Sequence, residues 1–323
     1  MVKIAIVTGV AGFIGSNLAE RLLKEKYKVI GIDCFTNYYS KKIKLKNLSN
    51  FINNKEFNFI EEDLISVNFD SLFKKDAVLF HQAGQPGVRA SWGEQFETYV
   101  KDNILVTQRI LESAKKMNNL KKIVMASSSS IYGNQDGIMK ENSTLPKTIS
   151  PYGATKLASE NLGFLYYENF GLPVTSLRYF TVYGPKQRPD MAFFKFIMAN
   201  LSEQKIELFG DGSQKRDFTF ISDIVEANIR TLEKNVEGEI LNVGGGSVRS
   251  IKQVLDIISR ETGKKNKIIF NNKEKGDVQK TEADIKNIEK KLNFKPKIML
   301  EKGLPLQIEW LKTIKNEYQE FLK

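Results

Sequence analysis

The sequence is poor in the residues that build disulfides and metal centres, since it holds one cysteine, Cys34, and one histidine, His81. A lone cysteine forms no internal disulfide, and the two side chains supply too few ligands for an ordinary zinc site. No apolar run reaches the roughly 20 residues that a membrane-spanning helix needs. Three glycines interrupt the first 19 residues, where a signal peptide would carry a continuous apolar block. We therefore expect a cytoplasmic protein without structural metal or membrane contact.

Acidic residues are scarce relative to basic ones, 38 against 49, which leaves a formal net charge of +11. The lysines are spread along the chain, and the densest groups, residues 41–46 and 264–267, contain no aromatic side chain. Surfaces that bind nucleic acid combine concentrated positive charge with aromatic side chains that stack on bases. We therefore expect no nucleic-acid partner, and the positive balance suits a small anionic substrate that carries phosphates.

What the sequence does have is an alternation of short apolar runs with amphipathic helical stretches. The runs span residues 3–8, 28–32, 57–60, 77–81, 122–127, 175–179 and 240–243. Strands that alternate with helices build a doubly wound parallel sheet, so we expect an α/β fold of the Rossmann type. Because the alternation loosens after Tyr183, we expect residues 1–180 to form the sheet domain, with part of 215–250 returning to it. Residues 181–323 are expected to form mainly a smaller C-terminal lobe that binds substrate.

A glycine-rich turn, Gly9–Gly15, joins the first expected strand to the first helix with the spacing GxxGxxG. Small residues there let the backbone and the positive end of the helix approach a pyrophosphate. Asp33 ends the next strand, where a carboxylate accepts hydrogen bonds from an adenine ribose diol and repels a 2′-phosphate. The pattern predicts a site that binds NAD in preference to NADP. Its expected ligands in this part of the chain are Gly9, Gly12, Phe13, Ile14, Gly15 and Asp33.

Two later strand ends extend the expected cofactor site. Asp63 and Leu64 follow the run 57–60, and Ala83 and Gly84 follow the run 77–81. The carboxyl ends of parallel strands line the ligand crevice of such a sheet, so we expect these residues to hold the adenine and the nicotinamide ribose sides. His81 lies inside an apolar run, which favours a buried packing histidine over a catalytic base.

Tyr152 and Lys156 carry the expected chemistry. They are four residues apart at the start of an expected helix, so their side chains share one face. An ammonium beside a phenol lowers the pKa of the phenol, and Lys156 can also hydrogen-bond the nicotinamide ribose. The spacing alone is common on exposed helices. Four successive serines, Ser127–Ser130, end the preceding strand; they form strands poorly and have no evident packing purpose, so we expect the Ser128 hydroxyl to bind a sugar O4.

Six motifs occur in order along the chain, namely TGVAGFIG, the serine segment, YGATK, RYFTVYGP, RDFTFISDIVEA and NVGGG. Over essentially its whole length the sequence resembles the extended short-chain dehydrogenases/reductases of the nucleotide-sugar epimerase/dehydratase group. The resemblance implies that Tyr152 is the acid/base, that Lys156 tunes it and binds ribose, and that Ser128 relays to the sugar O4.

The resemblance also implies a site for the nucleotide of the substrate. Arg216, in the RDF motif, would bind the diphosphate, and Asp277, in GDVQKT, the uridine ribose. Many similar proteins carry an arginine a few residues before that aspartate. This chain has Lys273-Glu274-Lys275 there, which leaves the second phosphate contact open.

The pair Ser129-Ser130 separates the reactions that the resemblance allows. Similar dehydratases carry an Asp-Glu pair at these positions, and similar UDP-glucuronate decarboxylases carry a glutamate at the position of Ser130. With neither carboxylate present, the chemistry left is oxidation and re-reduction at C4 with NAD recycled. The resemblance therefore implies 4-epimerisation through a 4-keto sugar.

The segment Thr181–Asp190 carries the substrate signal. Similar UDP-glucose 4-epimerases usually have asparagine at the position of Thr181, whereas TVYGPxxRPDMA and the pair Tyr38-Tyr39 resemble the UDP-glucuronate 4-epimerases. Arg188 offers a planar fork of donors to a C6 carboxylate, with Thr181 and the serines 129 and 130 completing the shell. The resemblance thus implies conversion of UDP-glucuronate to UDP-galacturonate. Alternatively, Arg188 only clamps its own loop by pairing with Asp190.

Other functions stay open at this point. Within enzymes, the alternative is a 4-epimerase for UDP-glucose or a UDP-N-acetylhexosamine. Outside enzymes, it is an NAD-binding regulatory module that senses redox state or binds RNA, against which the intact Ser128, Tyr152 and Lys156 argue. Similar proteins often dimerise through two helices per subunit, which here would be residues 94–116 and 151–170, so the resemblance implies a homodimer.

Overall fold

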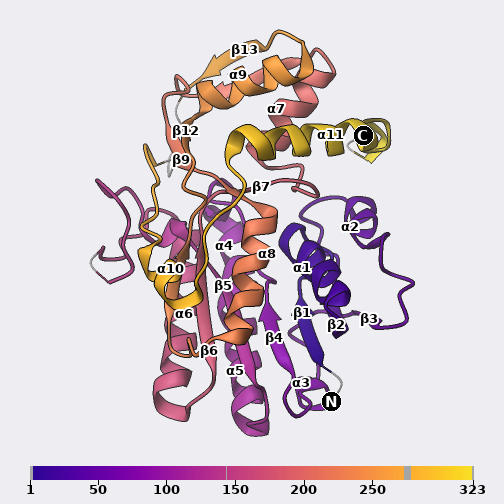
Figure 1. Cartoon of the computed structure of the whole chain (residues 1–323), viewed down its shortest axis with the longest axis vertical. Helices are drawn as coiled ribbons and strands as arrows, with labels where there is room; N and C mark the ends of the chain where they lie inside the picture. Colours follow the sequence, from indigo (N-terminus) through magenta and orange to yellow (C-terminus); the bar gives the residue numbers. More distant parts are fainter. Residues whose placement is uncertain (1–2, 143, 273–277, 322–323) are drawn as a thin grey trace.

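A seven-stranded parallel sheet forms the centre of the computed structural model, which describes residues 3–142, 144–272 and 278–321 (Figure 1). Its strand order is β11-β6-β5-β4-β1-β2-β3. The strands are β1 Ile4–Thr8, β2 Lys28–Asp33, β3 Phe57–Glu61, β4 Val78–His81, β5 Lys122–Ser128, β6 Val174–Tyr179 and β11 Ile240–Val243. Each lies within one residue of its predicted bounds, and the expected α/β fold of the Rossmann type is confirmed. The order reverses between β1 and β4, the place where open α/β sheets bind ligands.

Helices cover both faces of this sheet because alternate residues of a strand point to opposite faces. On β1, Ala5 and Val7 join the core beneath α1 Phe13–Lys24 and α8 Ile221–Arg230, which pack against each other. Ile6 joins the core beneath α5 Val106–Met117 and α6 Pro151–Phe170. Short helices complete this part of the molecule, namely α2 Lys41–Leu48, α3 Phe69–Leu72 and α4 Phe96–Tyr99.

The later chain builds a smaller lobe over the carboxyl ends of the strands (Figure 1). Its helices are α7 Ala192–Leu201, α9 Ile251–Thr262 and α11 Leu300–Phe321, while α10 Lys286–Leu292 lies lower, near β11. Three two-stranded ladders accompany them: β7 Val182–Tyr183 with β10 Thr219–Phe220, β8 Lys205–Phe209 with β13 Lys267–Asn271, and β9 Lys215–Asp217 with β12 Val248–Ser250. Across the described residues, no helix combines the length and apolar character needed to span a bilayer.

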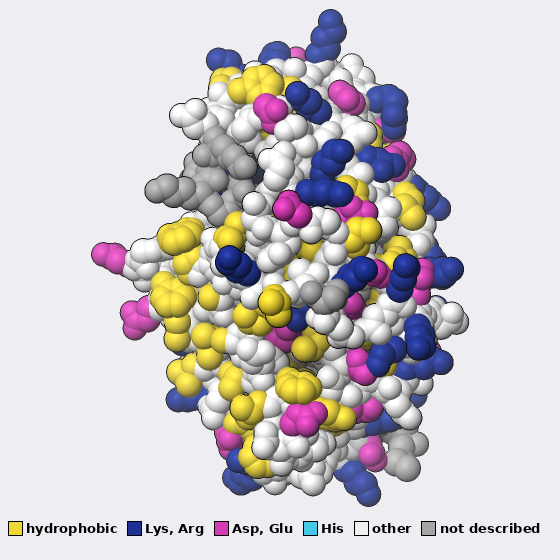
Figure 2. Space-filling view, turned by 90° about the vertical axis from the view of Figure 1, so that its left-hand side faces the viewer, with side chains coloured by type: hydrophobic (Ala, Val, Ile, Leu, Met, Phe, Trp, Pro, Cys, Tyr) yellow, Lys and Arg dark blue, Asp and Glu magenta, His cyan; other side chains and the backbone are white. Residues whose placement is uncertain are grey.

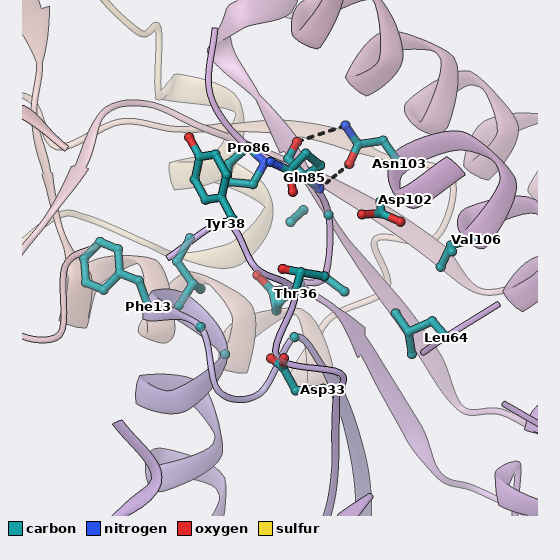
Figure 3. A pocket seen from close by; sticks show the side chains of 18 of the residues that line it. Phe13, Asp33, Thr36, Tyr38, Leu64, Gln85, Pro86, Asp102, Asn103 and Val106 are labelled. Atoms are coloured by element: carbon teal, nitrogen blue, oxygen red, sulfur yellow. Dashed lines mark hydrogen bonds between the residues drawn. The ribbon is translucent and has the colours of Figure 1, made fainter. Parts of the chain in front are cut away.

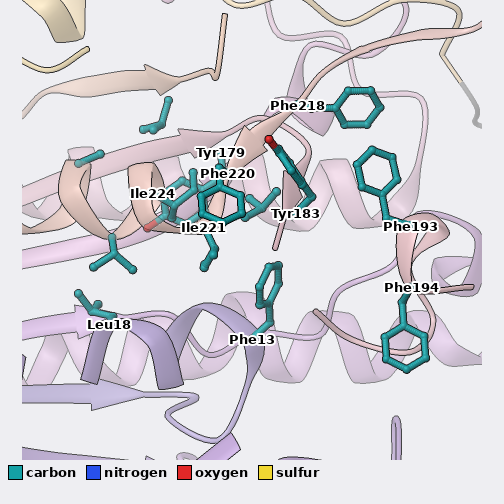
Figure 4. Packing of buried hydrophobic residues seen from close by; sticks show 14 of the residues in the cluster. Phe13, Leu18, Tyr179, Tyr183, Phe193, Phe194, Phe218, Phe220, Ile221 and Ile224 are labelled. Carbon is teal, nitrogen blue, oxygen red and sulfur yellow. The ribbon is translucent and has the colours of Figure 1, made fainter. Parts of the chain in front are cut away.

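An aromatic cluster joins the two lobes through one continuous core (Figure 4). The Tyr183 ring lies 5.5 Å from that of Phe193 and 5.3 Å from that of Phe220, and Phe193 lies 4.7 Å from Phe218. Buried aromatic pairs at these separations add to the free energy gained from burial. The lobe that closes over the strand ends is therefore packed firmly onto the sheet domain.

The helical segment expected over residues 94–116 is not one regular α-helix. A 3₁₀ turn over Gly93–Gln95 precedes α4, and a π-helical turn over Val100–Leu105 separates α4 from α5. The wider turn holds Asn103, whose side chain donates to Gln85 O (3.1 Å) and Thr155 Oγ1 (2.9 Å). We attribute the irregular winding to these buried hydrogen bonds. Turns of this kind commonly occur at functional sites.

Candidate active site

The glycine turn after β1 is packed too tightly for side chains. A Cβ on Gly15 would lie 2.2 Å from Gly9 O, and one on Gly9, whose φ is +68°, would lie 2.8 Å from Ala83 Cα. Helix α1 begins directly after Gly12, and no side chain caps its first turn. The N–H groups of that turn and the positive end of the helix dipole are therefore available to an anion.

Asp33, at the end of β2, is oriented by the backbone of the turns beside it. Its Oδ1 accepts from Phe35 N (2.8 Å) and its Oδ2 from Ala11 N (3.1 Å). Burial raises the pKa of this carboxyl, while the two backbone hydrogen bonds and nearby Lys44 oppose the rise. The Lys44 ammonium is itself held by Thr36 O (2.7 Å). The carboxylate therefore has a fixed direction at the edge of a cleft.

That cleft runs from the glycine turn to helix α6. Figure 3 shows the part of it around Asp33, Leu64 and Asn103. The cleft is lined by every residue that the sequence predicted for cofactor binding: Gly9, Gly12, Phe13, Ile14, Gly15, Asp33, Asp63, Leu64, Ala83, Gly84, Tyr152 and Lys156. Asp63 within it is fixed by Lys101 Nζ (2.6 Å) and Ile65 N (3.1 Å). The glycine turn leaves a space that a Cβ would fill, and the Asp33 carboxylate lies at the end of the neighbouring strand β2. This combination fits a dinucleotide.

Sequence reasoning missed several residues of this cleft. Asn103 Oδ1 accepts from Gln85 N (2.8 Å), which with the bond to Gln85 O braces the loop after β4 (Figure 3). Tyr179, at the end of β6, is hydrogen-bonded by Asn228 Nδ2 (2.8 Å) and also lines the cleft. The RYF motif was a usable signal for Tyr179. Nothing in the local pattern marked Asn103, because its role depends on the π turn.

Tyr152 and Lys156 lie on one face of α6 as the spacing predicted. The helix is capped by Ser150, whose Oγ accepts from Gly153 N (3.1 Å). Burial raises the pKa of the Tyr152 phenol, whereas a hydrogen bond with Ser128 and the charge of Arg188 lower it.

The ammonium of Lys156 lies towards the loop that follows β4. Its Nζ lies 3.8 Å from the point where a Cβ on Gly84 would sit, towards the end of β4. Burial lowers its pKa to about 8, and the charge of Glu160 opposes that change. In the described structure Ser128 and Arg188 lower the pKa of Tyr152, and the tuning of the phenol by Lys156 stays a prediction.

The serine segment ends β5 and continues into a 3₁₀ turn over Ser129–Ile131. Ser128 Oγ accepts from Ser130 N (3.1 Å), and Ser128 is the register partner of Tyr179 in β6. Thr181 follows β6, so it lies at the same sheet edge. Ser127 lines the cofactor cleft, whereas Ser128, Ser129, Ser130 and Thr181 are not among its lining residues. The expectation that all four serines lack a packing purpose is wrong for Ser127, whose Oγ donates to buried Glu160 (2.6 Å).

Arg188 forms the pair with Asp190 that the clamp interpretation expected. Its Nε and Nη2 donate to the two carboxylate oxygens, both at 3.0 Å, and Tyr38 OH donates to Asp190 Oδ2 (3.3 Å). A guanidinium has a second edge of two N–H groups, formed by Nη1 and Nη2. Within the described residues that edge has no hydrogen-bond partner, and Arg188 lines the same cleft as Tyr152. The clamp therefore fixes the plane of the guanidinium without using all its donors.

Three further residues singled out in the sequence are Arg216, Asp277 and His81. Arg216 is half-buried on β9, where its Nη1 donates to Lys215 O (2.8 Å), and it does not line the cleft. Asp277 and residues 273–275 lie outside the described residues. His81 is buried as expected. Its Nδ1 is hydrogen-bonded to Thr8 (2.8 Å) and its Nε2 to Thr107 (3.1 Å), and burial lowers its pKa to about 3.

Known proteins resemble this chain over most of its length. The model of the NAD dependent epimerase/dehydratase family matches residues 5–244. The uncharacterized UDP-glucose epimerase YtcB of Bacillus subtilis is 43% identical over 311 residues, 96% of this chain and 98% of that protein. A UDP-glucuronate 4-epimerase of Thermodesulfobacterium geofontis is 41% identical over 314 residues, 95% of each.

Among solved structures, the UDP-glucuronic acid 4-epimerase of Bacillus cereus in complex with UDP-glucuronic acid and NAD is similar throughout. The two share a TM-score of 0.93 and 40% identity, over 97% of this chain and 100% of that one. The extent of the sequence match and the shared fold leave one conclusion. The chain belongs to the NAD dependent epimerase/dehydratase family.

Proposed function

We propose that the protein is an NAD-dependent UDP-sugar 4-epimerase that interconverts UDP-glucuronate and UDP-galacturonate. The observation that carries the proposal is the position of Tyr152, hydrogen-bonded with Ser128, on a cleft that fits a dinucleotide and is also lined by Arg188. A phenol at this place exchanges a proton with a sugar hydroxyl, and a nearby guanidinium recognises a carboxylate. The relatives named UDP-glucuronate 4-epimerase support the same substrate.

The chain would hold NAD with residues at the ends of β1 and β2 and with a side chain of α6. The backbone of the glycine turn and the first turn of α1 would bind the pyrophosphate, and Asp33 the adenine ribose diol. Lys156 would bind the nicotinamide ribose, because its ammonium lies beside Gly84 at the end of β4. When bound, NAD supplies a reversible acceptor for the hydride of the sugar C4.

Tyr152 is the proposed acid and base. It takes the O4 proton as C4 is oxidised and returns it when the 4-keto sugar, turned over in the site, is reduced on its other face. The Ser128 hydroxyl hydrogen-bonds with the phenol and is placed to share a proton path to O4. Burial alone would hold the phenol neutral, so the lowering by Ser128 and Arg188 favours the proton transfer.

Arg188, Thr181 and the serines 129 and 130 form the proposed carboxylate site. Oxidation at C4 makes the glucuronosyl group a β-keto acid, in which the C5–C6 bond breaks readily. The carboxyl carbon then leaves as CO₂, and its bonding electrons form a C4 enolate that is protonated at C5. A carboxylate held end-on by the free edge of Arg188, whose plane Asp190 fixes, would keep this bond out of alignment with the carbonyl.

For the nucleotide, we propose that Arg216 binds the diphosphate and Asp277 the uridine ribose. We also propose that residues 1–180, with part of 215–250, form the NAD-binding domain and that 181–323 form mainly the substrate lobe. Packing of β11 beside β6 supports the returning segment.

A second candidate is a 4-epimerase for the neutral sugars UDP-glucose or UDP-N-acetylhexosamine. The observation that favours it is the Arg188–Asp190 pair, which neutralises the cation expected to attract a carboxylate. Incubation of the purified protein with UDP-glucuronate, UDP-glucose and UDP-N-acetylglucosamine in separate reactions, with chromatographic analysis of the products, distinguishes the two. We expect UDP-galacturonate at the highest rate. Faster turnover of a neutral sugar would replace the proposal by the second candidate.

We further propose that two copies of the chain associate through α4–α5 and α6. Hydrophobic side chains gather over the lower half of one face of the molecule (Figure 2). Large apolar residues on these helices are 37–49% exposed, namely Phe96, Val100, Leu105, Phe164, Leu165 and Phe170. A patch of this kind marks an interface in a soluble protein. Sedimentation should show a dimer that the pair Phe164→Glu and Leu165→Glu disrupts, while Leu306→Glu on α11 leaves it intact.

A further inference from the structure

Beneath the site lies a buried ion pair that the reaction outlined above does not use. Arg178 of β6 donates from Nε (2.9 Å) and Nη2 (2.6 Å) to the two carboxylate oxygens of Glu160 on α6. The side chains are only 4% and 1% exposed. Transfer of two charges out of water is costly, and apolar side chains of similar volume often stabilise a fold equally well or better. Stability alone therefore does not account for this pair.

The pair holds both ends of the serine segment. Ser127 Oγ donates to Glu160 Oε2 (2.6 Å), and Arg178 Nη1 donates to Tyr132 OH (2.6 Å). Ser127 precedes Ser128, and Tyr132 closes the 3₁₀ turn that contains Ser129 and Ser130. The three hydroxyls proposed to meet the sugar thus lie between two anchors attached to one ion pair.

Neighbouring strands extend the anchor across the sheet. Ser127, Arg178 and Asn242 are register partners on β5, β6 and β11. Tyr132 OH donates to Asn242 Oδ1 (2.8 Å), and Asn242 Nδ2 donates to Met139 O (2.9 Å). All these polar side chains are buried and hydrogen-bonded, which makes such a network rigid.

Glu160 also belongs to the helix that carries the proposed acid and base. Tyr152, Lys156 and Glu160 follow one another at four-residue intervals, so they lie along one face of α6. The carboxylate therefore connects the serine segment to the helix face that presents the phenol. Its charge also opposes the fall in the pKa of Lys156 that burial causes.

We propose that Glu160 and Arg178 are positioning residues, whose buried pair anchors Ser127 and Tyr132 and so fixes Ser128, Ser129 and Ser130 relative to Tyr152. The inference rests on the proposed function, since it assigns the serines to the sugar. Misplacement of reacting groups by about 1 Å costs on the order of 100-fold in rate. Loss of the anchors is therefore expected to lower kcat by roughly 10- to 100-fold and to change KM less.

The decisive variant is the double substitution Glu160→Met and Arg178→Met, which removes both charges together and leaves neither buried alone. Its matched control is Lys122→Met with Glu237→Met, since Lys122 Nζ pairs with Glu237 at the opposite end of β5. Hydrogen–deuterium exchange of the peptide covering residues 127–132 needs no substrate and reports the anchoring directly. Steady-state kinetics on the UDP-sugar that the wild type epimerises, product analysis and NAD content report its consequence.

We expect faster exchange in residues 127–132, a lower kcat, unchanged NAD content and more decarboxylated pentose from UDP-glucuronate, with none of these in the control. Should the double variant not fold, Ser127→Ala and Tyr132→Phe each remove one anchor. Ser127→Ala should speed exchange, and Ser127→Thr, which keeps the hydroxyl, should return it to the slow rate of the wild type. Unchanged exchange and kcat in a folded double variant, or in both single variants, would overturn the inference. A wild type that turns over only neutral sugars would correct the proposed substrate and leave the exchange measurement valid.

Discussion

Replacement of Arg188 by alanine tests the substrate assignment most sharply. The Arg188 side chain is 20% exposed and donates two hydrogen bonds to Asp190, whose side chain is 31% exposed. Arg188→Ala removes the proposed donor edge and also leaves that carboxylate facing the sugar carboxylate without its cation. Truncation of one partner in a desolvated charge pair costs about 2–5 kcal/mol. The value of kcat/KM on UDP-glucuronate should therefore fall by roughly 30- to 5,000-fold.

Asp190→Asn is the matched control for this substitution. It removes the clamp but keeps the guanidinium, so we expect a smaller loss, seen mainly in kcat because the arginine plane is no longer fixed. The assay is initial-rate product analysis for both variants on UDP-glucuronate and UDP-glucose, with the pentose product measured alongside. Arg188→Ala should lower the turnover of UDP-glucose much less, because that sugar lacks the carboxylate and loses only the effect of the Arg188 charge on the pKa of Tyr152. Equal losses on both sugars, or none on UDP-glucuronate, would refute the carboxylate site.

Three further predictions concern the cofactor and the acid/base. Asp33→Ser should strengthen binding of NADP relative to NAD by roughly tenfold or more, because a carboxylate near a phosphate is repelled by about 1–4 kcal/mol; titration of both cofactors measures this, and unchanged preference contradicts it. Tyr152→Phe should keep its fold and NAD content but lose roughly 100- to 10,000-fold in kcat, and a loss below about tenfold assigns the proton to another group. The pKa of Lys156 is about 8 in the folded protein, below its ordinary 10.5, so burial of the ammonium destabilises the fold. This cost in stability is fully present below pH 8 and is absent above pH 10.5. Lys156→Met should therefore raise the Tm of the NAD-free protein at pH 7 by about 5 °C. This increase in Tm should shrink as the pH rises from 8 to 10.5. An unchanged Tm at pH 7 would count against a buried charge at this position.

The sequence predicted well whatever is encoded by short spacing. The turn Gly9–Gly15 and the interval from Tyr152 to Lys156 fix local geometry, because three or four residues of a turn or helix have few arrangements. Alternating apolar runs also located the seven strands of the central sheet to within one residue, whereas the strands of the three two-stranded ladders were not predicted. The cleft then contained every predicted cofactor residue because parallel strands end at one edge.

Contacts between distant positions could not be predicted in this way. Tyr38 meets Asp190 across 152 residues, and Tyr132 meets Asn242 across 110. Such pairs depend on how layers pack, and a single sequence carries no pattern for them. The π turn around Asn103 escaped for the same reason, since its hydrogen bonds to Gln85 and Thr155 come from other elements.

The late arrival of β11 has a consequence for biosynthesis. The strand completes the sheet beside β6, yet about 60 residues separate Tyr179 from Ile240 in the chain. At a translation rate of about 5–20 residues per second, one edge of β6 stays unpaired for roughly 3–12 s before β11 is synthesised. Every residue of β6 is buried in the finished molecule, and an open apolar strand edge templates pairing with other chains. We therefore expect the nascent protein to be prone to aggregation, and to need chaperones, while the ribosome makes the segment between β6 and β11.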